Sequence, residues 1–377
     1  MAPAVITSGH PGMNGNVIFL QQRTHRAGAQ TCLARLLRHP GMHAWQPALV
    51  CAKDGWLTED CRSHAIPCLT HPFPSSRALL SRWFRNANFA RETAHALARH
   101  TLHPLIIQAN DHLEGLLGLE LAQRTHARCA IFLRSPGMTR EDYFKYRCPD
   151  YDLIIAVGDE LQARARSWDP GRNILLIHDG IESAEYCPPK PKPVAFPKKI
   201  LVIGSSLDWK GWSDLTEALH QLQQGGQLPE IQFDFTGDQP DPTRNNLRLE
   251  RMSKGAFHFL GRVEKFRDLV RQYDLAINPS RHESFGMAAI EVLFAGVPLL
   301  SSRSGIIEQV QENPAFLFAP QQPEALAASL KHLLQQWPEL DTSVVPAQEN
   351  IQKKFLVDYT VQKLSAAYTQ LLSTGTA

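Results

Sequence analysis

The sequence predicts an α/β protein built from two doubly wound domains. Short apolar runs rich in β-branched residues alternate with longer amphipathic stretches in both halves of the chain. That alternation is typical of parallel sheets covered by helices on both faces. A proline-rich stretch at residues 188–198 separates the halves, and 377 residues exceed the length of one ordinary domain.

The first half contains six runs of apolar residues, each of four or five residues, that we expect to form strands. They lie at residues 17–20, 47–50, 105–109, 130–133, 153–157 and 174–177. The second half contains five more, at residues 200–203, 231–236, 257–260, 275–279 and 299–301. Amphipathic spacing predicts helices between many of them, including residues 31–37, 212–224, 265–273, 287–295 and 323–336.

The domain boundaries follow from the prolines and from the last amphipathic stretch. Prolines at residues 188–198 exclude helix and central strand, so we expect a stiff linker there. The sequence therefore predicts a Rossmann-like domain at 1–187, a second at 199–348, and a terminal segment at 349–377. A helical pattern at residues 349–372 cannot bury its apolar stripe alone. We expect it to cross back onto the first domain, with ligands bound in a cleft between the two domains.

Charge and cysteine content narrow the class of protein. The 39 basic and 37 acidic residues give a net charge of +2, which excludes a polyanion-coating role. No apolar run reaches the roughly 18 residues of a membrane span, and the first residues do not resemble a signal peptide. The seven cysteines form no C-x-x-C pair. We expect a cytoplasmic enzyme with reduced thiols and no nucleic-acid partner.

Residues 279–291 form the most informative motif. An apolar strand ends at Pro279, and a helix begins near Gly286. The amides of Ser284, Phe285 and Gly286 would then lie at a helix N-terminus, which binds anions. Glu283 and Glu291 would lie about 12 Å apart on different sides. They cannot act as a paired acid and base, but they suit two contacts along an extended ligand.

Two further loops join a strand to a helix and carry basic residues. Lys210 lies in the loop 204–211 after the strand 200–203, where small residues let the backbone approach a phosphate. Gly28 lies in the basic loop 23–30 after the first strand. Neither a Walker motif nor a G-x-G-x-x-G fingerprint occurs, and the sixteen histidines show no metal-site spacing. We therefore expect no metal and no cofactor.

Residues 77–99 predict a basic helix that carries aromatic side chains. Five arginines oppose one acid there, and Trp83, Phe84 and Phe89 are interleaved with them. Such a helix can lie on an anionic membrane surface. The alternative is a solvated arginine face above an ordinary core side.

The motif at Glu283–Glu291 resembles that of the retaining glycosyltransferases of the two-domain GT-B fold, glycosyltransferases group 1, family four. The family carries P-S-x-x-E-x-F-G-x-x-x-x-E, which residues 279–291 match. Similarity continues through 295–298 and 305–308, through 235–238 and 259–262, and through 179–181. It is specific over about residues 150–330 and looser toward the N-terminus.

The resemblance implies a role for each residue. Glu291 would bind the ribose of a nucleoside diphosphate sugar, Glu283 the donor sugar, and Lys210 the leaving diphosphate. Ser284, Phe285 and Gly286 would hold the diphosphate and sugar. Arg262 would lie where the base pocket begins, and Gly28 would approach the donor phosphates. The transfer would retain anomeric configuration by a front-face route without a metal, in which the leaving phosphate accepts the proton. A nucleophilic Glu283 is the alternative reading.

The chain departs from the family at two positions. Ser205 replaces an arginine that usually binds phosphate, so Arg134 or Arg26 would have to serve. Residues 134–137 stand where the family usually has a histidine after the fourth strand. Asp111 and His112, together with Arg134, are therefore our candidates for acceptor contacts.

These features predict a glycosyltransferase of surface polysaccharide or lipopolysaccharide biosynthesis. Its acceptor would be a glycan or a lipid-linked sugar. It would act in the cytoplasm, with peripheral binding to the inner face of the membrane as the second expectation. Two alternatives stay open: a nucleotide-sugar epimerase of the same fold, and a nucleotide-sugar-binding protein that has lost catalysis, which Ser205 suggests.

Overall fold

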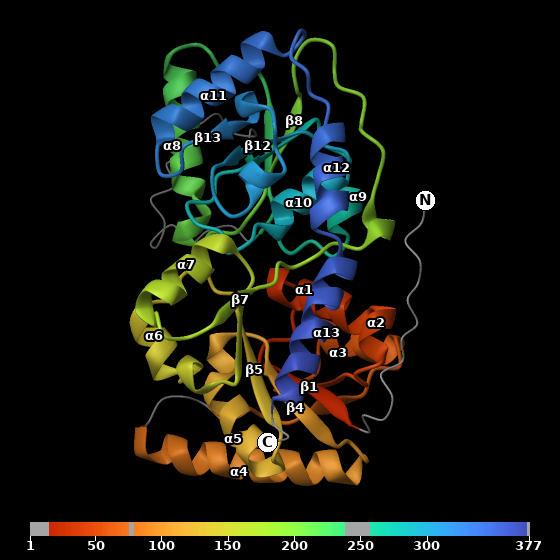
Figure 1. The fold of residues 1–377 in the computed structure, drawn as a ribbon. Coiled ribbons are helices and arrows are strands. Elements are labelled where there is room, and N and C mark those ends of the chain that lie inside the picture. Colours follow the sequence, from red (N-terminus) through yellow and green to blue (C-terminus); the bar gives the residue numbers. More distant parts are fainter. Residues whose placement is uncertain (1–14, 75–78, 238–256, 375–377) are drawn as a thin grey trace. The chain divides into compact units, whose positions relative to one another are not determined.

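A computed structural model describes residues 15–74, 79–237 and 257–374, with side chains left out at 79–83 (Figure 1). The chain divides into two compact units. Unit 1 contains the residues up to Gly180 together with those from Val357 onward, and unit 2 contains Ile181–Leu356. Both are α/β, as the sequence predicts.

Unit 1 is built on a parallel sheet in the order β3-β2-β1-β4-β5-β6-β7. Its central strands are almost wholly buried, which explains their continuous apolar runs, whereas the edge strands β3 and β7 are partly exposed. They are β1 (Asn16–Gln21), β2 (Ala48–Cys51), β3 (Cys68–Thr70), β4 (Pro104–Ala109), β5 (Arg128–Leu133), β6 (Leu153–Ala156) and β7 (Ile174–Leu176).

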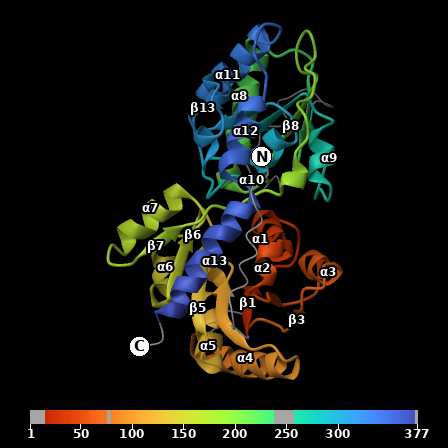
Figure 2. The ribbon, with the colours of Figure 1, turned by 45° about the vertical axis from the view of Figure 1, so that its right-hand side comes forward.

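Helices cover both faces of this sheet (Figures 1 and 2). One face packs on α4 and α5 through a core that includes Ile107, Ile131 and Leu121. The other face meets α13, whose Tyr368 donates a hydrogen bond to Gln108 of β4 at 2.8 Å. The helices of unit 1 are α1 (Gly28–Arg38), α2 (Pro40–His43), α3 (Trp56–Ser63), α4 (Leu79–Arg99), α5 (Gly115–Thr125), α6 (Arg140–Lys145), α7 (Asp159–Trp168) and α13 (Val357–Ser373).

Unit 2 is built on a second parallel sheet, in the order β10-β9-β8-β11-β12-β13. Helices α8 and α11 pack on one face around Trp337, Phe233 and Leu219. The strands are β8 (Lys199–Val202), β9 (Gln232–Phe235), β10 (Phe257–Phe259), β11 (Leu275–Asn278), β12 (Leu299–Ser302) and β13 (Leu317–Phe318). The helices are α8 (Trp212–Gln224), α9 (Phe266–Val270), α10 (Met287–Phe294), α11 (Pro323–Gln336) and α12 (Val345–Lys354).

The proline-rich stretch is not a linker between the units, contrary to the sequence expectation. It lies along unit 2, where Lys192 Nζ donates to the carbonyl of Trp337 at 3.0 Å and Trp337 Nε1 donates to that of Pro193 at 2.9 Å. Gly296 (φ +81°) admits this approach, because a Cβ there would lie 2.3 Å from the Pro188 carbonyl oxygen. The units change instead at Gly180 and again after Leu356.

The terminal amphipathic stretch is two helices rather than the single predicted one. Helix α12 belongs to unit 2 and α13 to unit 1. The break lies at Phe355, whose carbonyl accepts a hydrogen bond from the Ile181 amide at 2.9 Å. That distant partner replaces the amide that a continuous helix would supply, so local periodicity cannot reveal the break.

Two strands were missed by the sequence analysis. Both β3 and β13 are edge strands of only three and two residues. With β3 counted, Arg134 follows the fifth strand of unit 1, and His112 follows the fourth.

Candidate active site

The N-terminus of α10 lies directly after the loop that leaves β11, as the motif at 279–291 predicts. Gly286 caps the helix with φ +100°, and a Cβ at this position would meet nothing within 4 Å. Within the described residues, no side chain caps this end, and the amides of Gly286 and Met287 donate no hydrogen bond. The arrangement leaves helix-terminal donors and open space for an anion.

Lys210 and Glu283 form an ion pair beside this helix end. Lys210 ends the short 3₁₀ turn η4 (Asp208–Lys210), and its Nζ lies 2.7 Å from Glu283 Oε1. The two side chains are 22% and 12% exposed, so both remain open to a ligand. An ammonium has three donors, of which this pair occupies one.

Arg281 joins the two loops that carry this pair. Its amide donates to the Trp209 carbonyl at 2.8 Å. Its guanidinium bonds Asp214 and Asp208, with Nε 2.8 Å from Asp214 Oδ2. The hydrogen bond to Asp214 raises the pKa of Arg281, so this side chain keeps its charge. Arg281 was not predicted from the sequence, although its place between Ser280 and Glu283 in the motif was a signal.

Two glycines allow the close approach of these loops. Gly211 (φ +67°) precedes α8, and a Cβ there would lie 1.9 Å from the Pro279 carbonyl oxygen. Gly305 (φ +64°) lies against the Phe285 carbonyl, 2.4 Å from where its Cβ would be. Any other residue would push Lys210 or Phe285 out of place.

The remaining predicted residues of unit 2 follow the carboxyl ends of its strands or lie in α10. Ser205 follows β8. Its Cα would lie 3.5 Å from a Cβ added to Gly237. Arg262 is exposed and follows β10. Glu291 is half-buried within α10, eight residues after Glu283, which lies in the loop before the helix. Because parallel strands end at one edge, these loops gather on the same side of unit 2.

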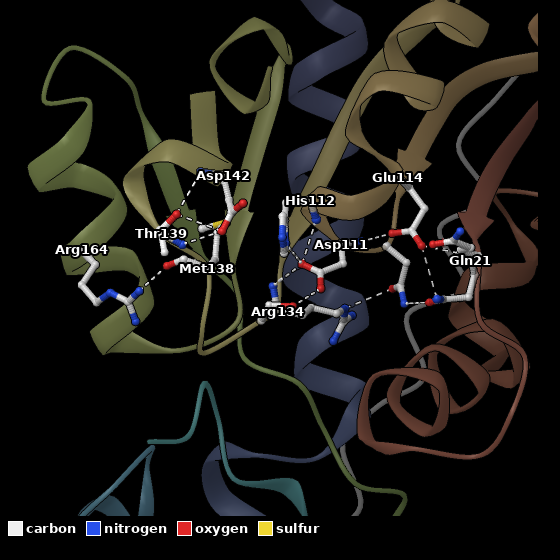
Figure 3. Close-up of polar contacts among 12 residues, drawn as sticks. Gln21, Asp111, His112, Glu114, Arg134, Met138, Thr139, Asp142 and Arg164 are labelled. Carbon is white, nitrogen blue, oxygen red and sulfur yellow. Dashed lines mark hydrogen bonds and ion pairs between the residues drawn. The ribbon is translucent and has the colours of Figure 1, made fainter. Parts of the chain in front are cut away.

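In unit 1, Asp111, His112 and Ser135 form a second polar cluster (Figure 3). Asp111 Oδ1 accepts from His112 Nδ1 at 2.9 Å, and Asp111 Oδ2 accepts from the Ser135 hydroxyl. Burial alone would raise the pKa of Asp111, but the hydrogen bond and charge of His112 outweigh it and lower that pKa. Burial lowers the pKa of His112, yet the hydrogen bond and charge of Asp111 raise it overall.

Glu114, which the sequence analysis missed, ties the ends of β1 and β4 together. Its carboxyl oxygens accept from the amides of Gln22 at 2.9 Å and Asp111 at 3.0 Å. Burial, and then the charge of Asp111, raise the pKa of Glu114 to about 8. Near neutral pH it is therefore mostly protonated. The residues next to Glu114 in the sequence gave no signal that its carboxyl group would be buried beside Asp111.

Arg134 is an internal residue of unit 1 rather than an open cation. It is 7% exposed, its Nη1 lies 2.6 Å from Asp179 Oδ1, and its Nε donates to Asn110 at 3.1 Å. Its charge is thus balanced within the chain, which argues against a replacement for the phosphate-binding arginine. Gly28, by contrast, is exposed at the start of α1 with nothing within 4 Å of a Cβ. Arg26 lies 5.2 Å from the Trp56 ring centre.

The predicted basic helix forms over residues 79–99 as α4, while Arg77 lies outside the described residues. The side chains of Arg82 and Trp83 are not described either. Phe89 is buried against Phe73, with ring centres 5.0 Å apart, whereas Phe84 is 70% exposed. The helix thus has both an ordinary core side and an exposed aromatic residue.

Stability should depend on pH through Glu114. Its pKa rises from 4.5 to about 8 on folding, so the folded state binds the extra proton between these values. Stability from this group is therefore lost as the pH rises through that window. The Glu114→Gln variant stays neutral, so we expect its stability relative to the natural protein to increase from about pH 5 to pH 8. Urea unfolding at several pH values measures this, and a constant difference would contradict it.

The fold is that of two-domain GT-B glycosyltransferases. The structure of Anabaena HepE in complex with UDP and glucose aligns with a TM-score of 0.77 and 18% identity, covering 94% of this chain and 99% of that one. Sucrose-phosphate synthase from Thermosynechococcus elongatus aligns with a TM-score of 0.75 and 18% identity, covering 96% and 100%. At such identities the likeness concerns the fold.

Residues 197–336, which include Lys210, Glu283 and Glu291, match the family model of glycosyl transferases group 1. A glycogen synthase of Mycobacterium tuberculosis is 28% identical over 165 residues, which cover 43% of this chain and 40% of the synthase. A 2-deoxystreptamine N-acetyl-D-glucosaminyltransferase of Niallia circulans is 29% identical over 111 residues, 29% of this chain and 28% of that enzyme. The matches thus span less than half of these relatives.

None of the described helices combines the length and apolar character that crossing a bilayer requires. Among the same residues, no group of three or more His, Cys, Asp or Glu side chains is arranged to hold a metal ion.

Proposed function

We propose that the protein is a glycosyltransferase that uses a nucleoside diphosphate sugar. The observation that carries this is the Lys210–Glu283 pair, 2.7 Å between Nζ and Oε1, beside the uncapped N-terminus of α10. Breaking a glycosyl–phosphate bond leaves negative charge on the diphosphate. A helix N-terminus and an ammonium stabilise that charge where it develops, without a metal ion.

The residues of unit 2 then divide the donor between them. The amides around Gly286 hold the diphosphate, and Lys210 neutralises the leaving oxygen. Glu283 binds hydroxyls of the donor sugar, Glu291 those of the ribose, and Arg262 lies toward the base. The Anabaena HepE structures in complex with UDP and with UDP-glucose support a uridine nucleotide as the first donor to test.

We propose retention of anomeric configuration by the front-face route, with a glycan or lipid-linked sugar as acceptor. In that route the acceptor oxygen bonds to the anomeric carbon as the bond to the diphosphate oxygen breaks. The diphosphate takes the electron pair and then the acceptor's proton, so no separate base is needed. A role in surface polysaccharide or lipopolysaccharide synthesis in the cytoplasm would fit such an acceptor.

Ser205 favours one rival function, a binding protein without catalysis, and an epimerase is the other. Thermal stabilisation by UDP-, GDP- and ADP-sugars identifies the donor. Release of nucleoside diphosphate is then measured with and without acceptor, and the anomeric configuration of the product by NMR. A transferase releases more nucleotide with acceptor, an epimerase releases it without transfer, and a binding protein is stabilised but releases none. No stabilisation by any nucleotide sugar would contradict the proposal.

A second part of the proposal is peripheral binding of α4 to anionic membranes. Phe84 is 70% exposed, and Arg85, Arg91 and Arg99 are exposed on the same helix. Basic and aromatic residues together favour an anionic interface. Flotation with vesicles rich in phosphatidylglycerol at low salt should carry the protein upward, and Phe84→Ser should weaken this. Failure of the natural protein to float would refute it.

A further inference from the structure

His112 lies where the strand order of the unit 1 sheet reverses. The order β3-β2-β1-β4-β5-β6-β7 changes direction between β1 and β4. His112 begins the 3₁₀ turn η1 (His112–Glu114) shortly after the carboxyl end of β4. In open parallel sheets, ligands bind outside the carboxyl ends of strands at such a reversal. The position of His112 therefore suits contact with a ligand.

Asp111 fixes which nitrogen of His112 meets the ligand. The hydrogen bond of 2.9 Å between Nδ1 and Asp111 Oδ1 holds the proton of a neutral ring on Nδ1. Nε2 has no hydrogen-bond partner among the described residues. It is also not one of the fully buried side-chain nitrogen and oxygen atoms that lack a partner in this part of the chain. The neutral ring thus offers a lone pair at Nε2 that is not fully enclosed, on a side chain that is 7% exposed.

The loop beside His112 is held from two sides (Figure 3). Arg164 of α7 donates to the carbonyl of Pro136 at 2.8 Å and to that of Met138. Asp111 accepts from the Arg134 amide at 3.2 Å and from the Ser135 hydroxyl. Both anchors are internal to unit 1, so the surroundings of Nε2 are organised before a ligand arrives.

The charges around His112 disfavour an anionic ligand. Asp111 lies in contact with the ring, and Asp142 of α6 acts on it at longer range, whereas Glu114 is mostly protonated near neutral pH. The cation of Arg134 is balanced by Asp179, with 2.6 Å between Nη1 and Oδ1. A phosphate or carboxylate would meet net negative charge here, whereas an uncharged hydroxyl would not.

Resting on the transferase function proposed above, we propose that Nε2 of His112 accepts a hydrogen bond from a hydroxyl of an uncharged sugar acceptor. Asp111 acts as the positioning residue that sets the tautomer. The acceptor is thereby recognised through a neutral sugar ring rather than through a phosphate group. Because the lone pair is lost on protonation, acceptor binding weakens as the pH falls through the pKa of His112.

The test compares two substitutions that separate the nitrogens. In His112→Asn, the side-chain amide can keep the hydrogen bond to Asp111 but has no group at Nε2. In His112→Gln, the amide reaches the Nε2 position but gives up the Asp111 bond. His126→Asn is the matched control, because His126 is exposed at the end of α5 with φ 55°, which asparagine tolerates. Acceptors are para-nitrophenyl glycosides of neutral sugars, with the donor that stabilises the protein.

We expect His112→Asn to lower kcat/KM for the acceptor about tenfold, mainly through a higher KM for the acceptor. His112→Gln should fall between it and the natural protein, and the control should match the natural protein. Independently of catalysis, the same glycosides should shift the His112 ring signals in NMR spectra, and inorganic phosphate should not. This second measurement still applies if the protein uses no nucleotide sugar.

Three results would overturn the inference. One is an unchanged acceptor KM in folded His112→Asn. Another is a shift of the His112 signals by phosphate in place of the glycosides. The third is no shift by either probe. If the natural protein binds no nucleotide sugar, that result would instead contradict the proposed function alone.

Discussion

Replacing Lys210 by alanine is expected to lower kcat for nucleotide release roughly 100- to 1000-fold. Lys210 Nζ lies 2.7 Å from Glu283 Oε1. The turn that carries Lys210 is held in place because the Trp209 carbonyl accepts a hydrogen bond from the Arg281 amide. The ammonium would act mainly on charge that develops as the diphosphate leaves. The loss should therefore appear in kcat more than in KM for the donor.

A lysine outside the site and the partner Glu283 provide the comparisons for Lys210→Ala. Lys353, exposed on α12 and paired with Glu349 at 3.0 Å, is a lysine of the same unit whose replacement by alanine should leave the rate unchanged. Glu283→Gln should also lower the rate. Because the two side chains contact each other, the double variant should lose less than the product of the single losses. A Lys210→Ala rate within threefold of the natural protein would refute the assignment.

Local sequence could predict one half of this pair's environment but not the pair. The strand-loop-helix pattern at 279–291 correctly placed Glu283 before a helix N-terminus, because the glycine and the apolar periodicity are local signals. The contact with Lys210 depends on Arg281 binding the Trp209 carbonyl, 72 positions away in the chain. A long-range hydrogen bond of this kind leaves no periodic pattern behind it.

The difference between local patterns and long-range contacts also explains the errors in the predicted domain limits. Proline content correctly excluded helix and strand at 188–198, but it says nothing of whether the segment packs on a unit. Lys192 and Trp337 settle that, through hydrogen bonds across the sequence. Glu114 illustrates the corresponding problem for chemistry. Its acidity depends on burial and on Asp111, which only the fold brings about.

Among the described glycines of unit 2, Gly211 should be the one where an added methyl group costs most. Its φ of +67° is strained for any L side chain, and an added Cβ would lie 1.9 Å from the backbone oxygen of Pro279. A backbone atom cannot rotate away as a side chain can, so the two loops must separate. We expect Gly211→Ala to lower the free energy of unfolding by about 2–4 kcal/mol, from backbone strain and overpacking together.

Gly226 provides the control that separates these two causes. It has nearly the same conformation, φ +63°, but a Cβ there would meet nothing within 4 Å. Gly226→Ala should therefore cost only the conformational part, about 1 kcal/mol. It should leave nucleotide release unchanged, whereas Gly211→Ala should slow it by displacing Lys210 from Glu283. Chemical denaturation and the release assay measure both effects. Equal destabilisation by the two substitutions would show that the loops tolerate separation, and that Gly211 does not set the position of Lys210.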